Sequence, residues 1–337
     1  GIAARSGADL DVAPDPAAAR QRYPGAPLVL VDLGTATACA RAGLPRRPGV
    51  VLVSREATAE QPWRAAEAIG AEHVALLPSA GPWLADRFAD TADTRPGATG
   101  RIITVIGGRG GAGASVLAAG LAVTGARAGL RALLVDADPL GGGIDLLLGW
   151  EAADGLRWPS LTETSGPVPP PALVDALPGR GDLSVLSCDR SDQVEVPLAA
   201  MATTLDAGRL GQHLVVVDLP RNLNDAATLA ISMADLVLMV VPAEIRACAA
   251  AARVAARVAA HTEALSVVVR GPAPGRLRAR DISRALGLPA VGTLRPEPEI
   301  ARGIERGDPP AASGRGPLAG LCQRLLTELG LFGSAAS

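Results

Sequence analysis

The glycine-rich segment at residues 107–115 contains the residue types whose spacing could do the clearest chemistry. Glycines let the backbone curl so that successive N–H groups converge on phosphate oxygens, and a helix beginning near Ser115 would add its N-terminal dipole. The Ser115 hydroxyl is in addition a suitable ligand for Mg²⁺. The residues predicted to form this phosphate-binding loop are Gly108, Arg109, Gly110, Gly111, Ala112, Gly113, Ala114 and Ser115.

The loop departs from the usual phosphate-loop pattern at one position. The stretch from Gly108 to Ser115 fits G-x-x-x-x-G-K-[ST] except that Ala114 stands where the lysine is expected. No lysine occurs anywhere, because all 32 basic residues are arginines. A positive charge near the β- and γ-phosphates stabilises the transferring phosphoryl group. We therefore expect hydrolysis to be weak or absent, although backbone N–H groups could still hold ATP or ADP with Mg²⁺.

The remaining composition argues against several other kinds of site. A net charge of −2 gives no global reason to expect a nucleic acid or an anionic membrane as a partner. The cysteines form no CxxC pair and no Cys/His cluster, so we expect small core residues and not zinc ligands or disulfides. They are Cys39, Cys188, Cys248 and Cys322. No apolar run reaches the ~18 residues that a membrane-spanning helix needs.

Alternating strands and helices must position the loop. An aliphatic strand is predicted before it, at Ile102–Ile106, and a helix after it, at Ser115–Ala128. Further strands are predicted at Ala132–Val135, Leu183–Leu186, Leu214–Val217, Leu236–Val241, Leu265–Val269 and Val291–Leu294, and helices at Asn224–Ala234 and Ala243–Ala260. This pattern is typical of a doubly wound, mostly parallel α/β sheet, whose ligands bind beyond the carboxyl ends of the strands.

The beginning of the chain predicts a smaller α/β domain. Its predicted strands are Val29–Asp32, Gly49–Ser54 and Glu72–Leu77, with helical patterns at Trp63–Gly70 and Gly81–Ala89. The segment Asp90–Gly100 is polar and contains proline and glycine, which favours a linker. We therefore expect one domain at residues 1–89, a linker at residues 90–100 and a P-loop domain at residues 101–332.

Several motifs of the P-loop domain together resemble the MinD/ParA family of deviant Walker ATPases. The segment Arg109–Ser115 resembles the family motif K-G-G-x-G-K-[ST]. Leu134–Pro139 (LVDADP) resembles the switch I segment, and Val215–Pro220 (VVVDLP) resembles the Walker B or switch II segment. Leu294–Ile300 and Gly307–Pro310 resemble the late loop and helix on the adenine side. The motifs occur in the family's order across most of the domain.

This resemblance implies roles for individual residues. Asp138 matches the catalytic carboxylate that positions the attacking water, and Asp218 matches the Mg²⁺-linked Walker B residue, which would share the metal with Ser115. For both aspartates, capping of a strand end is the alternative. Arg109 matches the lysine that reaches across an ATP-bound dimer, so the resemblance also implies a homodimer through the P-loop face. Arg270 stands where relatives usually carry an asparagine that reads adenine.

Within the family, the chain most resembles the CpaE/TadZ-like septum-site-determining (Ssd) proteins of actinobacteria. The stretches that carry this resemblance are Val105–Ser115, Asp136–Gly149, Gly155–Pro159 and Val268–Gly275. The N-terminal portion of those proteins resembles a response-regulator receiver that lacks its phosphorylation chemistry, and residues 7–89 fit such a pseudo-receiver. Asp32 ends a strand as receiver aspartates do, but no acidic pair closes an earlier strand. A phosphorelay role is therefore not expected.

Three further features each allow two interpretations. The tail Pro317–Phe332 has apolar residues at helical spacing; we expect core packing, with peripheral membrane contact as the alternative, because its polar face offers only Arg324 as a cation. The arginines within residues 276–284 favour a solvated helix face over DNA binding. Trp150 and Trp158 fit either a partner-docking surface or core packing.

The residues and the resemblance together predict a cytoplasmic spatial regulator that is recruited to the septum or the cell pole. It would position a cell-division septum or a Flp-type pilus or secretion system by forming a homodimer and recruiting a protein of that machinery. Two alternatives remain open: a slow Mg²⁺-dependent ATPase in which Arg109 compensates for the lysine, and a scaffold that binds no nucleotide. DNA and the membrane surface are not the expected partners.

Overall fold

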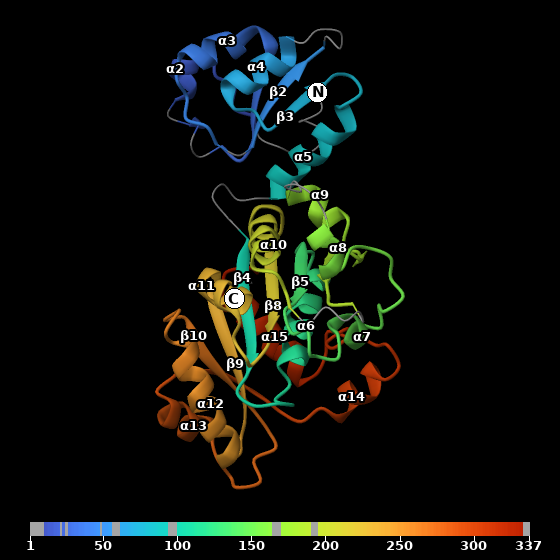
Figure 1. Cartoon of the computed structure of the whole chain (residues 1–337), viewed down its shortest axis with the longest axis vertical. Coiled ribbons are helices and arrows are strands. Elements are labelled where there is room, and N and C mark those ends of the chain that lie inside the picture. Colours follow the sequence, from blue (N-terminus) through green and yellow to red (C-terminus); the bar gives the residue numbers. More distant parts are fainter. Residues whose placement is uncertain are drawn as a thin grey trace, which may run out of the picture. The chain divides into compact units, whose positions relative to one another are not determined.

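The computed structural model describes residues 10–20, 22, 23, 26–47, 49–55, 61–93, 100–163, 170–189 and 195–332. The chain divides into two compact units, residues 1–98 and residues 99–337. Each unit has its own sheet (Figure 1). Each also has its own hydrophobic core.

The first unit is a small α/β fold around a 3-stranded parallel sheet in the order β1-β2-β3. Its elements are α2 (Pro16–Ala19), β1 (Val29–Asp32), α3 (Leu33–Arg41), β2 (Val50–Ser54), α4 (Gln61–Ile69), β3 (His73–Leu76) and α5 (Gly81–Asp93). The predicted strands are confirmed to within a residue at each end. Helix α5 is longer than predicted, because no glycine or proline interrupts residues 90–93, so the start of the predicted linker is helical. Residues 94–99 of that linker lie outside the described residues.

Asp32, the residue that resembles a receiver aspartate, caps helix α3. Its Oδ1 accepts the backbone N–H groups of Gly34 at 2.8 Å and Thr35 at 3.1 Å. Its Oδ2 accepts the hydroxyl of Thr35 at 2.6 Å. These hydrogen bonds, above all the one from the Thr35 hydroxyl, hold the pKa of the Asp32 carboxyl below its ordinary value. The structure therefore gives this aspartate a helix-capping role.

The second unit contains an 8-stranded sheet in the order β11-β10-β9-β4-β8-β5-β7-β6. The strands are β4 (Arg101–Gly107), β5 (Ala132–Asp136), β6 (Gly179–Arg180), β7 (Leu183–Leu186), β8 (Leu214–Leu219), β9 (Leu236–Pro242), β10 (Leu265–Arg270) and β11 (Ala290–Leu294). Every pair of neighbours runs parallel except β6 and β7. The predicted doubly wound, mostly parallel sheet is confirmed.

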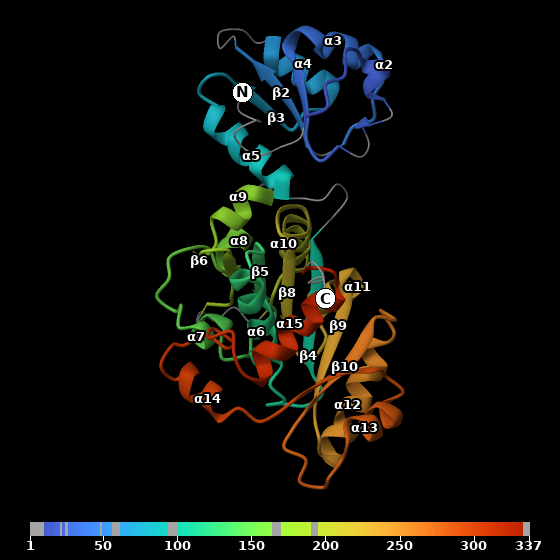
Figure 2. The ribbon, with the colours of Figure 1, turned by 180° about the vertical axis from the view of Figure 1, so that it is seen from behind.

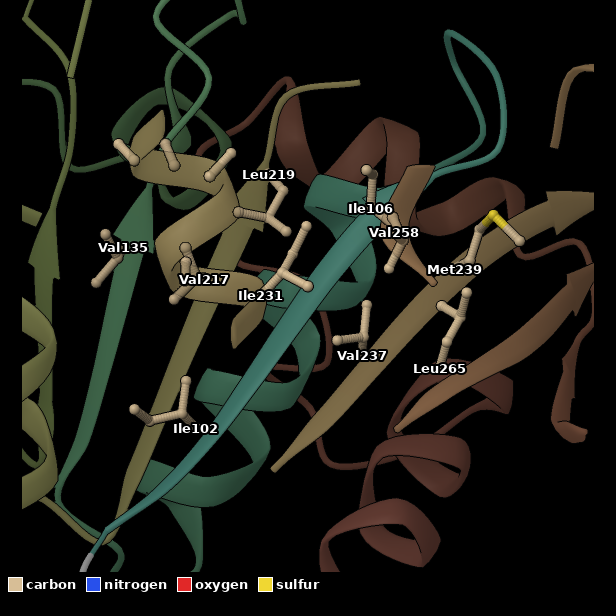
Figure 3. Close-up of a cluster of buried hydrophobic side chains, with 14 of the residues drawn as sticks. Ile102, Ile106, Val135, Val217, Leu219, Ile231, Val237, Met239, Val258 and Leu265 are labelled. Atoms are coloured by element: carbon tan, nitrogen blue, oxygen red, sulfur yellow. The ribbon is translucent and has the colours of Figure 1, made fainter. Parts of the chain in front are cut away.

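Helices cover both faces of this sheet. They are α6 (Ala114–Arg127), α7 (Ile144–Leu148), α8 (Trp158–Glu163), α9 (Pro170–Asp175), α10 (Leu198–Gly211), α11 (Asp225–Met233), α12 (Ile245–Val258), α13 (Ala279–Leu286), α14 (Pro298–Ile304) and α15 (Pro317–Glu328). One face packs on α10 to α13, in the cluster drawn in Figure 3, and the other on α6, α7 and α15 (Figure 2). Strand β4 serves both faces, since Ile102 and Ile106 point to the first cluster and Ile103 and Val105 to the second.

The tail helix α15 is part of the second core cluster. Leu318, Leu321, Leu325 and Leu326 are at most 1% exposed, and the helix packs against α6. The predicted core packing is confirmed, so this apolar face is not available to a membrane in the folded unit. Among the helices that the structure describes, none is long and apolar enough to cross a membrane.

Both tryptophans of the segment after β5 are buried. Trp150 is 5% exposed and Trp158 is 2% exposed. The Trp158 indole N–H donates to the carbonyl oxygen of Asp136 at 2.6 Å, and the Arg180 guanidinium lies 5.0 Å from the centroid of the Trp150 ring. The interpretation of these tryptophans as a partner-docking surface is therefore wrong. They hold the segment after β5 on the core.

Candidate functional site

A cavity of about 540 Å³ opens at the carboxyl ends of the central strands. Its wall includes Arg109–Ser115 from the loop after β4, together with Asp138, Asp218, and the segments Arg270–Pro272 and Leu294–Pro298. These segments are far apart in the sequence and meet here because parallel strands end at the same edge of the sheet. The structure thus brings together every predicted site residue except Gly108 around one cavity.

Gly108 positions the loop instead of lining the cavity. Its backbone N–H donates to the carbonyl oxygen of Val240 at 2.9 Å, which ties the loop to β9. A Cβ at this position would come within 2.8 Å of the Ala251 Cβ, so only a glycine lets α12 pack this closely. The residue therefore sets where the loop leaves the sheet, and the next residues supply its lining.

The loop has the curled backbone that its glycines predict. Gly111 and Gly113 have φ angles of +67° and +94°, in the left-handed region that favours glycine. Gly113 is the N-cap residue of α6 and offers no side-chain oxygen to the N–H groups of the first turn. Those donors and the helix dipole therefore remain for an anion. The geometry fits the phosphate groups of a nucleotide.

Ser115 and Asp218 form a polar pair in the wall of this cavity. The Ser115 hydroxyl donates to the carboxylate of Asp218, which is 4% exposed. Burial raises the pKa of Asp218 to about 8, although the hydrogen bond from Ser115 lowers it; the nearby carboxylates of Asp136 and Asp138 raise it further. A hydroxyl and a carboxylate are ligands that Mg²⁺ accepts when phosphate oxygens and water complete its shell. The pair fits a Mg²⁺ ion held together with a nucleotide.

Among the described residues, no purely protein-made metal centre accompanies this pair. In the part of the chain that the structure describes, no three His, Cys, Asp or Glu side chains lie together so that they could hold a metal ion. A metal bound at Ser115 and Asp218 would therefore depend on phosphate oxygens for further ligands, as Mg²⁺ commonly does in nucleotide sites.

Asp136 organises the segment between β5 and α7. Its Oδ1 accepts the N–H of Asp138 at 3.1 Å, and its Oδ2 accepts the N–H of Ile144 at 2.9 Å. The side chain is 2% exposed, and burial is the main cause that raises the pKa of its carboxyl to about 6. It also lies directly beside Asp218 across the β5–β8 pair. Asp136 thus fixes the turn that carries Asp138.

Asp138 combines both of the roles that its sequence position allows. The side chain is half-buried and lines the cavity. Its Oδ1 also accepts the N–H of Leu140 at 3.2 Å, and its carbonyl oxygen accepts the N–H of Gly141 at 2.9 Å. The residue therefore caps a turn and presents a carboxylate to the cavity. Its participation in hydrolysis stays a prediction.

Arginines supply positive charge around the loop in the absence of the lysine. Arg109 donates from Nη2 to Oε1 of Glu244, the N-cap residue of α12, at 2.9 Å. Arg270, the last residue of β10, donates from Nη1 to the carbonyl oxygens of Gly111 and Ala112, both at 3.0 Å. The residue at the lysine position, Ala114, lines the cavity as a methyl group.

Three arginines line the cavity that the sequence did not assign to the phosphate groups: Arg221, Arg270 and Arg295. The family resemblance placed Arg270 and Arg295 only on the adenine side, and Arg221 was not singled out. Each stands at or within two residues beyond the carboxyl end of a parallel strand: β8, β10 and β11, respectively. That position was the available signal, because such strand ends meet at one edge of the sheet. This signal identifies site residues only when the order of the strands in the sheet is known, because that order decides which strand ends are neighbours.

Comparisons with known proteins agree with this geometry. Residues 1–99 match a family described as Rv3660c-like, CheY-like N-terminal domain. Residues 103–310 match the family described as CobQ/CobB/MinD/ParA nucleotide binding domain. The uncharacterized protein Rv3660c of Mycobacterium tuberculosis is 42% identical over 290 residues, which cover 86% of this chain and 81% of that protein.

Solved structures share the fold of the second unit. MinD in the MinC:MinD cell division protein complex of Aquifex aeolicus is similar with a TM-score of 0.56 and 24% identity, over 67% of this chain and 96% of that one. The septum site-determining protein MinD of Pyrococcus horikoshii OT3, complexed with Mg-ADP, has a TM-score of 0.59 and 17% identity, over 68% and 98%. The chain therefore belongs to the CobQ/CobB/MinD/ParA nucleotide-binding family and carries a CheY-like domain at its N-terminal end.

Proposed function

We propose that this protein is a spatial regulator that binds ATP or ADP with Mg²⁺, forms a homodimer and recruits a protein of the cell-division or the Flp-type pilus and secretion machinery. Hydrolysis is slow or absent. The observation that carries the proposal is the combination of a curled glycine loop, leading into the uncapped first turn of α6, with an alanine, Ala114, at the lysine position.

The residues that would hold the nucleotide are those of the curled loop and the first turn of α6. Their backbone N–H groups would bind phosphate oxygens, and Ser115 with Asp218 would hold the Mg²⁺ ion. When bound, Mg²⁺ supplies charge neutralisation to the phosphates. This chain's own residues position the ligands, because Gly108 holds the loop after β4 and Asp136 holds the segment after β5.

Two observations support slow or absent hydrolysis. Ala114 offers no charge to a transferring phosphoryl group, and such charge contributes strongly to catalysis. Arg109, which stands at the signature position of the family, is engaged with Glu244 of the same chain at 2.9 Å. To contact a nucleotide in a second subunit, it would have to leave that ion pair. Both features favour a protein that holds a nucleotide over one that turns it over quickly.

The proposed homodimer would form through the face that carries the loop. Leu140, in the turn that Asp136 fixes, is 81% exposed, and Ile245, next to the ion-paired Glu244, is 76% exposed. Exposed large apolar side chains beside a site favour a protein contact there. A cell-division partner is supported by the fold shared with MinD, which was solved with MinC. The CpaE/TadZ resemblance supports the pilus or secretion machinery as the partner system.

The first test is the shift in melting temperature when ATP or ADP is added with Mg²⁺. A nucleotide at about 100 times its Kd should add about 2.7 kcal/mol to the free energy of unfolding. The variant Gly113→Val should lose this shift, because a Cβ there would lie 3.1 Å from Nη1 of Arg270. The matched control is Gly129→Val, which has a similar φ of +81° but no atom within 4 Å of its Cβ, and which should keep the shift.

The outcome separates the proposal from its alternatives. No shift in the wild-type protein at millimolar nucleotide would contradict nucleotide binding and leave a scaffold that kept only the fold. A shift accompanied by Mg²⁺-dependent turnover that Asp138→Ala abolishes would instead indicate a working ATPase. A shift without measurable turnover is the expected result.

A further inference from the structure

A guanidinium from a distant strand lies against the loop that has lost its lysine. We infer that Arg270 takes over the role of that lysine: it holds the P-loop in its curled form and provides a positive charge to the phosphates of the bound nucleotide. The inference rests on the proposed nucleotide binding and assigns a phosphate ligand within it. Arg270 is 159 positions away from Gly111 in the sequence, so β10, and not the loop itself, supplies the charge.

The contacts of Arg270 with the loop are specific. Its Nη1 donates to the carbonyl oxygens of Gly111 and Ala112, each at 3.0 Å, and so ties together two consecutive peptide groups of the loop. A guanidinium has five N–H donors in a fixed plane. Because Arg270 also lines the cavity, donors that do not hold the loop are available to phosphate oxygens. Partial burial strengthens such charge-assisted hydrogen bonds relative to a fully exposed cation.

Gly113 makes room for this side chain. A Cβ on Gly113 would lie 3.1 Å from Nη1 of Arg270 and 3.5 Å from its Cδ and Cζ. Gly113 is also the N-cap residue of α6, whose first N–H groups would bind phosphate. The guanidinium therefore packs beside the N–H donors that would hold the anion, where its positive charge adds to the dipole of the helix N-terminus.

The backbone of Arg270 is held firmly enough to act as a ligand platform. The residue ends β10, which pairs with β9 on one side and β11 on the other. Its carbonyl oxygen accepts the N–H of Ala243 at 2.8 Å, and the next residue, Gly271, donates to the carbonyl oxygen of Leu294 at 2.9 Å. A side chain on a paired strand end is positioned more rigidly than one on a free loop.

The other arginines near the loop are less suited to this role. Arg109 is engaged in the ion pair with Glu244. Arg221 and Arg295 line the cavity but are exposed, and Arg221 approaches only the edge of the loop, 3.7 Å from where a Cβ on Gly110 would stand. Exposed cations interact weakly because water screens them. Arg270 is thus the best-placed substitute for the lysine.

Isothermal titration calorimetry of the full chain tests the assignment with ADP, inorganic triphosphate and adenosine as probes. We expect Arg270→Ala to weaken ADP and triphosphate binding by about 10- to 100-fold, as for loss of a hydrogen bond to a charged group, and Arg270→Lys to keep most of the affinity. Adenosine binding should not change. The control Arg253→Ala alters an exposed arginine of α12 outside the cavity and should bind all probes like the wild-type protein.

A rescue experiment distinguishes replacement of the lysine from a merely structural role. Restoring the lysine with Ala114→Lys in the Arg270→Ala background should return triphosphate affinity to within about threefold of wild type, a non-additive effect that a double-mutant cycle measures. Without any ligand, hydrogen exchange of the amides at residues 111–115 should be faster in Arg270→Ala than in wild type, because the loop loses two hydrogen bonds.

Each contrary outcome has a definite meaning. If wild-type protein binds triphosphate and Arg270→Ala binds it equally well, the assignment of Arg270 is wrong while the proposed nucleotide binding stands. Weaker binding of adenosine but not of triphosphate would make Arg270 a base-reading residue and would also overturn the assignment. If the wild-type protein binds neither ADP nor triphosphate, the proposed function and this inference fail together.

Discussion

At the scale of single residues, the site keeps its oxygen ligands and redistributes its cations. Ser115 and Asp218 are joined by a hydrogen bond in the cavity wall, and Asp218 is buried beside Asp136. Burial is the main reason for the raised pKa values of both carboxyl groups, and neighbouring carboxylates raise them further: Asp138 and Asp145 for Asp136, and Asp136 and Asp138 for Asp218. A divalent cation would relieve this electrostatic cost. In its absence, stability must depend on pH.

We predict that the metal-free protein loses stability as pH rises from about 4 to about 8. The pKa of Asp218 is 3.8 unfolded and about 8 folded, so across this window the folded state keeps a proton that the unfolded chain has released. Stability from this group is complete below the lower pKa and is lost as pH rises through the higher one, by up to about 1.4 kcal/mol per pH unit. Urea unfolding at several pH values, with a chelator present, measures it.

The variant Asp218→Asn serves as the comparison for this titration. Asparagine cannot ionise but still offers an oxygen to the Ser115 hydroxyl. The free energy of unfolding of the variant should therefore rise relative to that of the wild-type protein as pH rises. Asp136, whose pKa is raised to about 6, adds a smaller loss of the same sign in both proteins. Parallel pH profiles for the two proteins would show that Asp218 is ionised in the folded state throughout, contrary to the prediction.

At the scale of elements, the sheet positions the residues of the site, and helix α15 supports helix α6, which begins at the site. The carboxyl ends of β4, β5, β8, β10 and β11 deliver the lining residues to one edge. Helix α6, which begins at the phosphate loop, is covered by α15. A Cβ on Gly120 of α6 would lie only 3.1 Å from Leu318 of α15, so the two helices are in close contact. The tail helix therefore supports the helix that would bind phosphate.

We predict that Leu325→Ala lowers the free energy of unfolding of the second unit by roughly 2–5 kcal/mol, because it leaves a cavity between α15 and the sheet. Leu325 is 1% exposed. The exposed Gln323 of the same helix provides the control, and Gln323→Ala should change stability by no more than about 0.5 kcal/mol. Chemical denaturation followed by circular dichroism gives both values. A membrane role for this face would instead require Leu325→Ala to leave the stability unchanged.

At the scale of the whole molecule, the proposed regulator works through association. The loop face, at the carboxyl ends of the strands, carries the exposed Leu140 and Ile245. The exposed Leu210 lies near the end of α10, just before β8 begins, and therefore at the amino ends of the strands. The two faces therefore offer a matched pair of apolar side chains, 76% exposed at Ile245 and 61% exposed at Leu210. A dimer through the loop face should depend on the first and not on the second.

We predict that Ile245→Asp weakens nucleotide-dependent dimerisation at least about tenfold, because a carboxylate would be desolvated at the centre of the contact. Leu210→Asp should dimerise like the wild-type protein. Sedimentation velocity over a range of concentrations, with and without ATP and Mg²⁺, measures the dimer fraction. Equal effects of the two substitutions, or a monomer under all conditions, would contradict a dimer through the loop face.

The sequence by itself determined the glycine loop and the strands of the larger sheet other than the short β6, whereas the family resemblance paired Ser115 with Asp218. These are local signals: aliphatic runs mark buried parallel strands, and glycines permit the left-handed φ angles of Gly111 and Gly113. The motifs and their order along the chain were then enough to identify the family, because the family is defined by those motifs in that order. Helix α5 shows the limit of such signals. The polar composition of Asp90–Gly100 predicted a linker, yet the helix continues to Asp93.

The tertiary structure alone decided which charges face the loop and which apolar side chains are free. Arg270 meets Gly111 across 159 positions, and Arg109 meets Glu244 across 135, so neither contact follows from spacing. The buried Trp158, likewise, donates its indole N–H to the carbonyl oxygen of Asp136, on a strand 22 positions away. Strand order determines such contacts, and strand order comes from the packing of two helical layers on one sheet, which no local pattern encodes.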